Sequence, residues 1–232
     1  MNSIYRQALG ADFDRLHPKI QARFGFDSES GVASIGRGTM SRVWHGPWWT
    51  LPFLLMGTWR NIMFPESGED VPFTIRNYAY RDGFGRETVT WIRQFDLTRG
   101  TGKKRMGRRF DAYMIHSAER GGIVDYMGTH QHLAVDLAVS VDPTGGIRER
   151  SGEQRFYEGP IAFSFPMLFS AYADVCEWYD DERGRYQIEV VVKNPVFGPI
   201  FGYRGEFDVE WLEGEAAIVP PEILPRREER RE

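Results

Sequence analysis

The sequence of 232 residues contains a single cysteine, Cys176, so no disulfide can form within the chain. So little cysteine is typical of proteins from reducing compartments. The first fifteen residues include Arg6, Asp12 and Asp14, which leave no room for the apolar core of a signal peptide. We therefore predict a cytoplasmic protein.

A surplus of positive charge and a long apolar run are also missing. The formal net charge is −4, whereas domains that bind nucleic acid are usually basic. The most apolar stretch, residues 47–64, contains Pro52, Gly57 and Arg60 and barely approaches the ~20 apolar residues of a transmembrane helix. We predict no nucleic-acid partner, and we expect residues 47–64 to cover the domain as a buried or half-buried segment.

Motifs of familiar catalytic sites are absent as well. The chain has no G-x-S-x-G and no H-E-x-x-H, and Cys176 has no flanking histidine. Residues 98–109 hold six Lys or Arg, but Leu97 and Lys104 stand where a Walker A loop needs Gly and Ser or Thr. We interpret this basic loop as a solvated hairpin loop, with anion capture as the alternative. The sequence predicts no cofactor.

Aromatic residues are abundant, at 14% of the chain with seven Trp, and side chains alternate with a period of two from Val71 to Leu212. Both features favour strands. Residues 71–81 and 86–97 flank the hairpin-type turn Asp82-Gly83-Phe84-Gly85, and similar turns follow. About nine strands without intervening helices predict a mainly β fold, an antiparallel lipocalin-like barrel or strongly curved sheet, because open sheet edges are a liability.

The pattern predicts a single domain over residues 1–212 with a helical segment at residues 1–65. In that segment Leu16, Ile20 and Phe24 recur at the spacing of an amphipathic helix. Residues 36–45 are expected to form a further short helix. Residues 213–232 contain several prolines and end in seven consecutive charged residues, which predicts a disordered tail.

Several ungapped stretches between residues 3 and 212 share motifs with a bacterial protein family. They include SIYRQALG, GTWRNIMFPE, VPFTIRNYAYRDGFGRETVTW, SGEQRFYEGP and FGPIFGYRGEFDVEW. In this order they resemble domain-of-unknown-function family 4166 (DUF4166). The resemblance implies a domain that occurs alone, as expected here, or attached to a dehydrogenase-like NAD(P)-binding domain. It implies no particular site residue.

Two histidines give a weak metal-binding signal. His130 and His132 are two residues apart in a predicted strand, so both side chains and Asp136 leave the same face. Imidazole and carboxylate groups bind divalent metals. The opposite face, with Leu133 and Val135, is the packed one, so the three polar side chains are expected to point outward. We predict no metal site and keep this trio as the alternative.

Charged residues on apolar strand faces give a stronger signal. Arg93 shares a face with Trp91, Glu177 shares one with Tyr179, and Arg155 shares one with aromatic Tyr157. A buried charge needs a partner, and alternation sends a whole face one way. We therefore predict that Arg93, Arg155 and Glu177 meet inside the barrel.

Two cations and one anion in this trio leave one arginine to hold a ligand carboxylate, phosphate or polar head. Trp91 and Tyr179 are then expected to pack on the apolar part of the ligand. The alternative is an ion-pair network that only holds the barrel shut. A separate aromatic cluster around Trp48 and Trp49 is interpreted as a plug on the barrel, with a ligand lid or a hook into the membrane interface as alternatives.

Three classes of function follow. The favoured one is binding of a hydrophobic small molecule or lipid in a barrel cavity, with a ligand-binding set of Arg93, Arg155, Glu177, Tyr179, Trp91, Trp48 and Trp49. The second is an enzyme of the isomerase, hydratase or cyclase kind that uses Glu177 and Arg155 as acid and base. The third is a membrane-peripheral or protein-interaction module that uses the Trp-rich segment.

Overall fold

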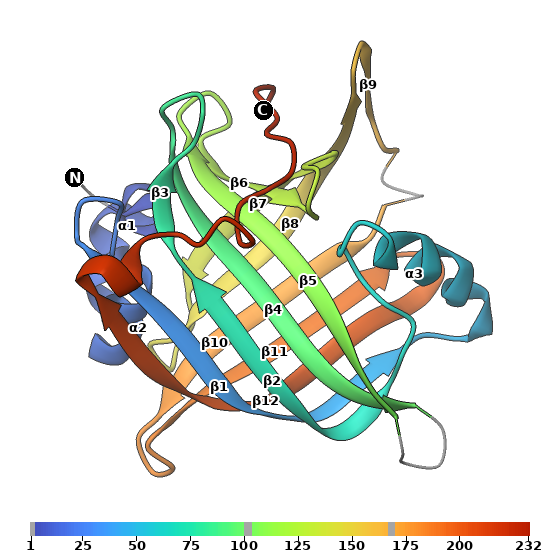
Figure 1. Cartoon of the computed structure of the whole chain (residues 1–232), viewed down its shortest axis with the longest axis horizontal. Helices are drawn as coiled ribbons and strands as arrows, with labels where there is room; N and C mark the ends of the chain where they lie inside the picture. Colours follow the sequence, from blue (N-terminus) through green and yellow to red (C-terminus); the bar gives the residue numbers. More distant parts are fainter. Residues whose placement is uncertain (1–2, 100–103, 167–169) are drawn as a thin grey trace.

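A computed structural model describes residues 3–99, 104–166 and 170–232. In this part of the chain ten antiparallel strands close into a barrel (Figure 1), in the order β10-β11-β12-β1-β2-β4-β5-β6-β7-β8, with β8 pairing back to β10. The prediction of an antiparallel barrel with N-terminal helices is confirmed. The barrel strands are β1 (Val32–His45), β2 (Gly68–Asn77), β4 (Glu87–Arg99), β5 (Lys104–Ser117), β6 (Gly122–Met127), β7 (Leu133–Val141), β8 (Ile147–Glu158), β10 (Tyr172–Asp180), β11 (Arg185–Asn194) and β12 (Gly198–Glu213). Two short strands, β3 (Ala79–Arg81) and β9 (Ile161–Ser164), extend the sheet beside β4 and β8.

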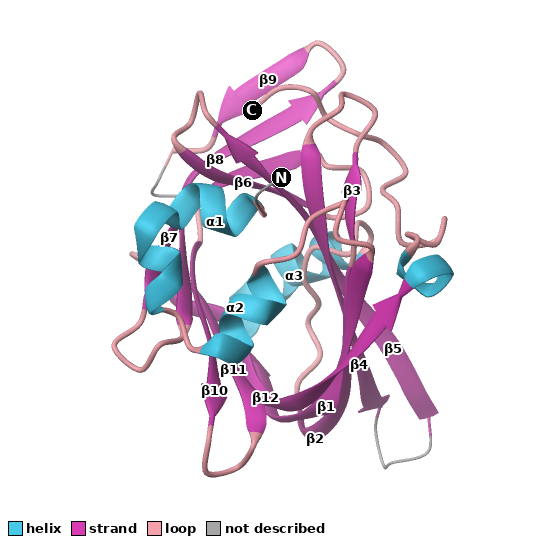
Figure 2. Cartoon of the chain, turned by 90° about the vertical axis from the view of Figure 1, so that its left-hand side faces the viewer, coloured by secondary structure: helices cyan, strands magenta, loops and turns pink. Residues whose placement is uncertain are grey.

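Helical segments lie at the two ends of the barrel. Viewed along the barrel in Figure 2, α1 and α2 lie across the near opening and α3 lies at the far one. These segments are α1 (Ile4–Leu9), η1 (Gly10–Arg15), α2 (Pro18–Phe24), η2 (Trp48–Thr50) and α3 (Leu51–Thr58). None of the helices in the described residues has the length and hydrophobicity that a membrane crossing requires.

The barrel interior is filled by one face of each strand, as the period of two requires. On β4 the side chains of Val89, Trp91, Arg93, Phe95 and Leu97 are all buried, and the four apolar ones belong to the main core. Helix α2 adds Ile20 and Phe24 to the same core, because its apolar face turns toward the barrel. The interior is therefore a packed core with a charged residue in it.

Strand β1 replaces the short helix that was expected at residues 36–45. It pairs with β12 on one side and β2 on the other. Gly36 interrupts its apolar alternation for a steric reason: a Cβ there would lie 2.5 Å from Cγ2 of Ile75 and 2.7 Å from Cδ2 of Phe207. The bulk of Phe207 fills the space that a β1 side chain would need, so the strand carries a weak hydrophobic pattern. The helical prediction for this part of residues 1–65 was wrong.

A β-bulge in β8 changes which side chains face the barrel interior. Leu137 pairs with Ser151 and Val135 pairs with Gln154, so β8 has one extra residue between these two pairs. Glu149 and Ser151 on one side of the bulge and Gln154 on the other all line the interior. Odd-numbered residues of β8 face the interior before the bulge and therefore face outward after it.

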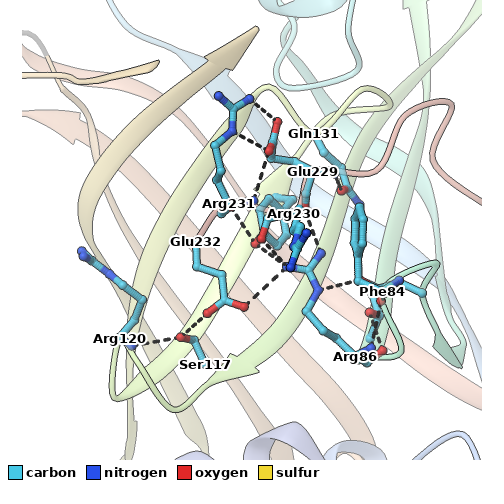
Figure 3. A network of polar contacts seen from close by, with 12 residues as sticks. Phe84, Arg86, Ser117, Arg120, Gln131, Glu229, Arg230, Arg231 and Glu232 are labelled. Atoms are coloured by element: carbon cyan, nitrogen blue, oxygen red, sulfur yellow. Dashed lines mark hydrogen bonds and ion pairs between the residues drawn. The ribbon is translucent and has the colours of Figure 1, made fainter. Parts of the chain in front are cut away.

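The charged C-terminal segment lies along the outside of the barrel instead of being disordered as its composition predicts. After the short turn η4 (Gly214–Ala217), Ile223 is buried in a second apolar cluster with Tyr113 and Tyr126, and the Tyr113 hydroxyl donates a 2.9 Å hydrogen bond to the Ile223 carbonyl. The segment continues into the polar network of Figure 3, where Arg86 meets the chain at residues 229–232. The burial of Ile223 favours this packed position of the segment despite its polar composition.

The basic loop is described only in part, since residues 100–103 fall outside the described residues. In the part of residues 98–109 that belongs to β5, Arg108 pairs with Glu66 and Arg109 pairs with Asp111.

Candidate site in the barrel cavity

A cavity of about 90 Å³ lies inside the barrel. Most of its lining is apolar, with side chains such as Val135, Leu137 and Ile188. Seven buried side chains with polar atoms also line it, from five strands: Trp91, Arg93, Asp125, Glu149, Ser151, Glu177 and Tyr203. A few polar groups that converge in an apolar cavity are the usual form of a small-molecule site.

Glu177 on β10 has a direct partner from the N-terminal helices. Arg23, on the core face of α2, is 2% exposed and donates from Nε to Oε1 of Glu177 in a short hydrogen bond. The guanidinium carbon of Arg23 also lies 5.1 Å from the ring centroid of Trp91 and 4.9 Å from that of Phe207. Burial raises the pKa of Glu177, while Arg23 and Arg93 act in the opposite direction.

Arg93, in the middle of β4, has much weaker partners. It donates a 3.3 Å hydrogen bond from Nη1 to the Tyr203 hydroxyl, and its guanidinium carbon lies 4.2 Å from the ring centroid of Phe110. Its Nε makes no hydrogen bond, and among the described residues no carboxylate is close enough to form an ion pair with it. Arg93 is thus a buried cation without a direct counter-ion.

Asp125 on β6 and Glu149 on β8 are carboxyl groups that interact electrostatically with Arg93 without contacting it directly. Burial raises the pKa of Asp125 to about 7 and that of Glu149 to about 7, and Arg93 is the main influence that lowers both. Each carboxyl is therefore divided between its protonated and ionised forms at neutral pH. Two carboxyl groups that face one cation in a low-dielectric interior cannot both ionise freely.

Several polar atoms of the side chains that line this cavity lack a hydrogen-bond partner in the part of the chain that the structure describes. They are Nε1 of Trp91, Nε of Arg93, Oδ1 of Asp125, Oε1 of Glu149 and Oε2 of Glu177. A buried polar atom left without a partner costs about 1–3 kcal/mol. All five side chains line the same cavity, and together they offer donors and acceptors to a polar group or water bound there.

The structure brings together only part of the predicted trio. Arg93, Glu177 and Trp91 line the cavity. Tyr179 does not line it: its ring stacks on His17 at 5.1 Å between centroids, near the α2 end of the barrel.

The placement of Arg155 inside the barrel was wrong. The bulge in β8 turns Arg155 to the outer face, where it donates a 2.5 Å hydrogen bond to Asp136 and pairs with Glu153. Arg23 supplies the second interior cation in its place. With Arg23, Arg93 and three carboxyl groups, the interior has an excess of acid groups, whereas the predicted trio had an excess of cations.

The alternative metal trio does not converge. His130 and His132 lie in the turn before β7, with their ring centroids 5.6 Å apart, and His132 pairs with Glu158. Asp136 is held on the outer face by Arg120 and Arg155. Among the described residues no group of three His, Cys, Asp or Glu side chains is arranged to hold a metal ion.

Trp48 and Trp49 lie at the α3 end and outside the cavity lining. Trp48 is 79% exposed, and the Trp49 ring packs against Phe197 at 5.5 Å between centroids. The cluster around them is thus only partly a plug.

Three residues of the site were missed by sequence reasoning: Arg23, Asp125 and Glu149. Arg23 follows Ile20 by three residues and so shares its helix face, a signal that was available. Asp125 stands in the run IVDYM, where both strand faces are apolar. Glu149 and Arg155 are both odd-numbered, so regular alternation would put them on the same face of β8. The bulge places them on opposite faces.

Comparisons with known proteins identify the family of the chain. Residues 16–207 match the model of the family "Domain of unknown function (DUF4166)". The chain belongs to this family. It is also 31% identical over 210 residues to the "Uncharacterized protein YndH" of Bacillus subtilis (strain 168), an alignment that covers 90% of this chain and 98% of the relative. No solved structure gives a significant match.

Proposed function

We propose that this DUF4166 domain binds a small, mainly apolar molecule inside its barrel and holds a polar group of that molecule among Arg93, Asp125 and Glu149. The observation that carries the proposal is the set of five unpartnered buried polar atoms around one largely apolar cavity. Groups left unpaired in this way favour a ligand that supplies both a donor and an acceptor.

The size of the cavity limits the ligand. An apolar cavity of ~150 Å³ holds benzene, which has six non-hydrogen atoms, so a space of about 90 Å³ suits a molecule with fewer than six. A long-chain lipid does not fit this form of the barrel. Of the two ligand classes expected from the sequence, the small molecule is therefore the one we propose.

Native mass spectrometry of the protein purified from its own host tests this function. We expect a bound small molecule in the wild type and its loss in Ala173→Leu, which fills the cavity that Ala173 lines. Ala162→Leu on exposed β9 is the matched control and should keep the ligand. Wild-type protein that is empty and gains no stability from any small apolar ligand would contradict the proposal.

A second candidate function is contact with a lipid surface at the α3 end. Five large apolar side chains there are strongly exposed: Trp48 at 79%, Phe53 at 65%, Leu55 at 59%, Met56 at 68% and Trp59 at 83%. Residues 48–59 carry no charge, and Arg60 follows them. Trp at a membrane–water interface and a basic residue beside it are a common combination.

Sedimentation with vesicles of phosphatidylcholine and phosphatidylglycerol tests this contact. We expect the wild type to sediment and the double variant Trp48→Ala, Trp59→Ala to stay in solution. Its stability should change by less than about 0.5 kcal/mol, since both side chains are exposed. Equal sedimentation of the two proteins would rule out this surface.

A further inference from the structure

The charges inside the barrel are arranged in two groups. Arg23 and Glu177 neutralise one another in a direct ion pair. The second group is Arg93 with the two carboxyl groups of Asp125 and Glu149, which project into the same cavity from β4, β6 and β8. Because the interior disfavours net charge, one cation beside two carboxyl groups leaves one of them ionised and the other protonated.

Such a pair holds a base and an acid at the same time. Oδ1 of Asp125 and Oε1 of Glu149 have no hydrogen-bond partner among the described residues, and both side chains line the cavity. Environments that let one carboxyl group keep its proton while a neighbour loses its own are a recognised basis for acid–base catalysis.

Two donors face the same cavity. Nε of Arg93 and Nε1 of Trp91 are also unpartnered, and both belong to β4. N–H groups fixed in a dry, apolar space stabilise negative charge that develops on a carbonyl oxygen during reaction. The cavity thus offers donors for an oxygen atom and carboxyl groups for the carbon atoms beside it.

From this geometry we infer that the domain catalyses the shift of a carbon–carbon double bond in a small ketone or aldehyde, with Asp125 and Glu149 as the acid–base pair and Arg93 and Trp91 as the donors to the carbonyl oxygen. The inference rests on the proposed function, because the substrate must first occupy the cavity. It specifies the ligand as an unsaturated carbonyl compound.

The step needs no cofactor or oxidant. The ionised carboxylate removes a proton from the carbon between the carbonyl and the double bond, and the electron pair of that C–H bond moves toward the carbonyl oxygen to give a dienolate. Arg93 and Trp91 stabilise the oxygen anion. The protonated carboxyl group then gives its proton to the far carbon, which restores the carbonyl and leaves the double bond conjugated with it. The two carboxyl groups have exchanged roles, and no atom is gained or lost.

But-3-enal, with five non-hydrogen atoms, is a suitable probe. Its conversion to but-2-enal is followed by ultraviolet absorbance, and its binding is followed by saturation-transfer NMR in the same samples. We expect the wild type to accelerate the conversion, and Asp125→Asn and Glu149→Gln each to reduce the rate by about 100-fold or more. Glu153→Gln on the outer face of β8 is the matched control for Glu149→Gln and should keep the wild-type rate.

The outcomes separate the two proposals. If the aldehyde binds and the wild type does not accelerate its conversion, the catalytic inference is overturned while the binding function stands. If the aldehyde neither binds nor reacts, the catalytic inference is overturned, and the binding function is overturned with it where native mass spectrometry finds the protein empty. Acceleration that survives in both carboxyl variants, with their folding checked by circular dichroism, would place the reaction elsewhere.

Discussion

Arg86 and Arg93 are close neighbours in sequence and differ in almost every contact. Arg86, just before β4, donates to Asp82 at 2.7 Å and to the Tyr126 hydroxyl at 3.0 Å, and it also binds the backbone of the C-terminal segment (Figure 3). Arg93 makes one long hydrogen bond, to Tyr203 at 3.3 Å, and keeps an unpartnered Nε. Residue type is the same in both cases, so the difference lies in what surrounds the guanidinium.

The comparison separates a structural charge network from a candidate site. The outer network uses its charges to fix the C-terminal segment, and each oxygen of Glu229 has an arginine donor. The inner cluster leaves donors and acceptors without partners around a cavity. We conclude that buried charge alone does not mark a site, whereas buried charge with unused hydrogen-bonding groups does.

The largest effect is expected when the direct ion pair between Arg23 and Glu177 in the barrel interior is broken. Glu177→Gln leaves Arg23 buried without its counter-charge, which should lower the free energy of unfolding by about 3–5 kcal/mol. Urea denaturation measures this change. Glu206→Gln, which removes a carboxylate paired with Arg183 and Arg185 on the outer surface, is the control and should cost less than about 1 kcal/mol. Equal effects would mean that the inner pair is no more important than a surface pair.

The next effect is on the pH dependence of stability. Asp125 has a folded pKa of about 7, above that of an unfolded aspartate, so the folded state binds the proton more tightly. Stability therefore decreases as pH rises from about 4 to 7 and is level above that range. Asp125→Asn should remove roughly 2 kcal/mol of the difference in unfolding free energy between pH 5 and pH 8.

Urea denaturation at the two pH values checks this expectation, with Asp208→Asn as an exposed control. A difference that is the same in wild type and Asp125→Asn would show that the carboxyl group ionises normally inside the barrel. That result would also remove the physical basis for an acid–base pair there.

A smaller effect distinguishes the two arginines directly. Arg86→Met removes several charge-assisted hydrogen bonds and should cost about 2 kcal/mol. Arg93→Met should cost less than about 1 kcal/mol, because Asp125 and Glu149 can remain protonated and the methionine packs against Phe110. Urea denaturation at pH 7 measures both.

The two variants should also differ in what they lose. Arg86→Met is expected to expose the C-terminal segment to limited proteolysis, and Arg93→Met is expected to lose the bound ligand in native mass spectrometry. If Arg93→Met destabilises as much as Arg86→Met and keeps its ligand, the inner cluster is an ion-pair network that holds the barrel shut.

Much of the fold could be predicted from sequence because alternation and hairpin turns are local signals. The strand face that carries Trp91 and Arg93 follows from period two alone. Strand β1 could not be recognised in this way, since Gly36 stands where Phe207 of a distant strand fills the interior. The ordered C-terminal segment was missed for a similar reason: its anchor, Ile223, is one apolar residue among polar ones and depends on a surface that only the folded barrel provides.

Only part of the candidate site could be predicted from the sequence. Arg93 and Glu177 were found because each interrupts an apolar strand face. Their partners depend on tertiary structure: Arg23 arrives from a helix, and Asp125 and Glu149 face the cavity only once strand order and the bulge are fixed. A bulge adds one residue, so every later side chain of the strand moves to the opposite face. No local sequence pattern in β8 predicts this bulge.

The smallest effect is expected for Arg155, which the sequence placed in the site and the structure places outside it. Arg155→Gln removes one of two cations that hold Asp136, and Arg120 remains as the other. The carboxylate is therefore not left unpaired, and the substitution also removes the charge of the buried Arg155 side chain, so the free energy of unfolding should fall by less than about 1 kcal/mol. Ligand retention in native mass spectrometry should equal that of the wild type, because the outer face of β8 does not line the cavity. Loss of ligand from Arg155→Gln with its stability intact would show that β8 has the unbulged register in solution, and the comparison of inner and outer charges would have to be redrawn with Arg155 on the inner side.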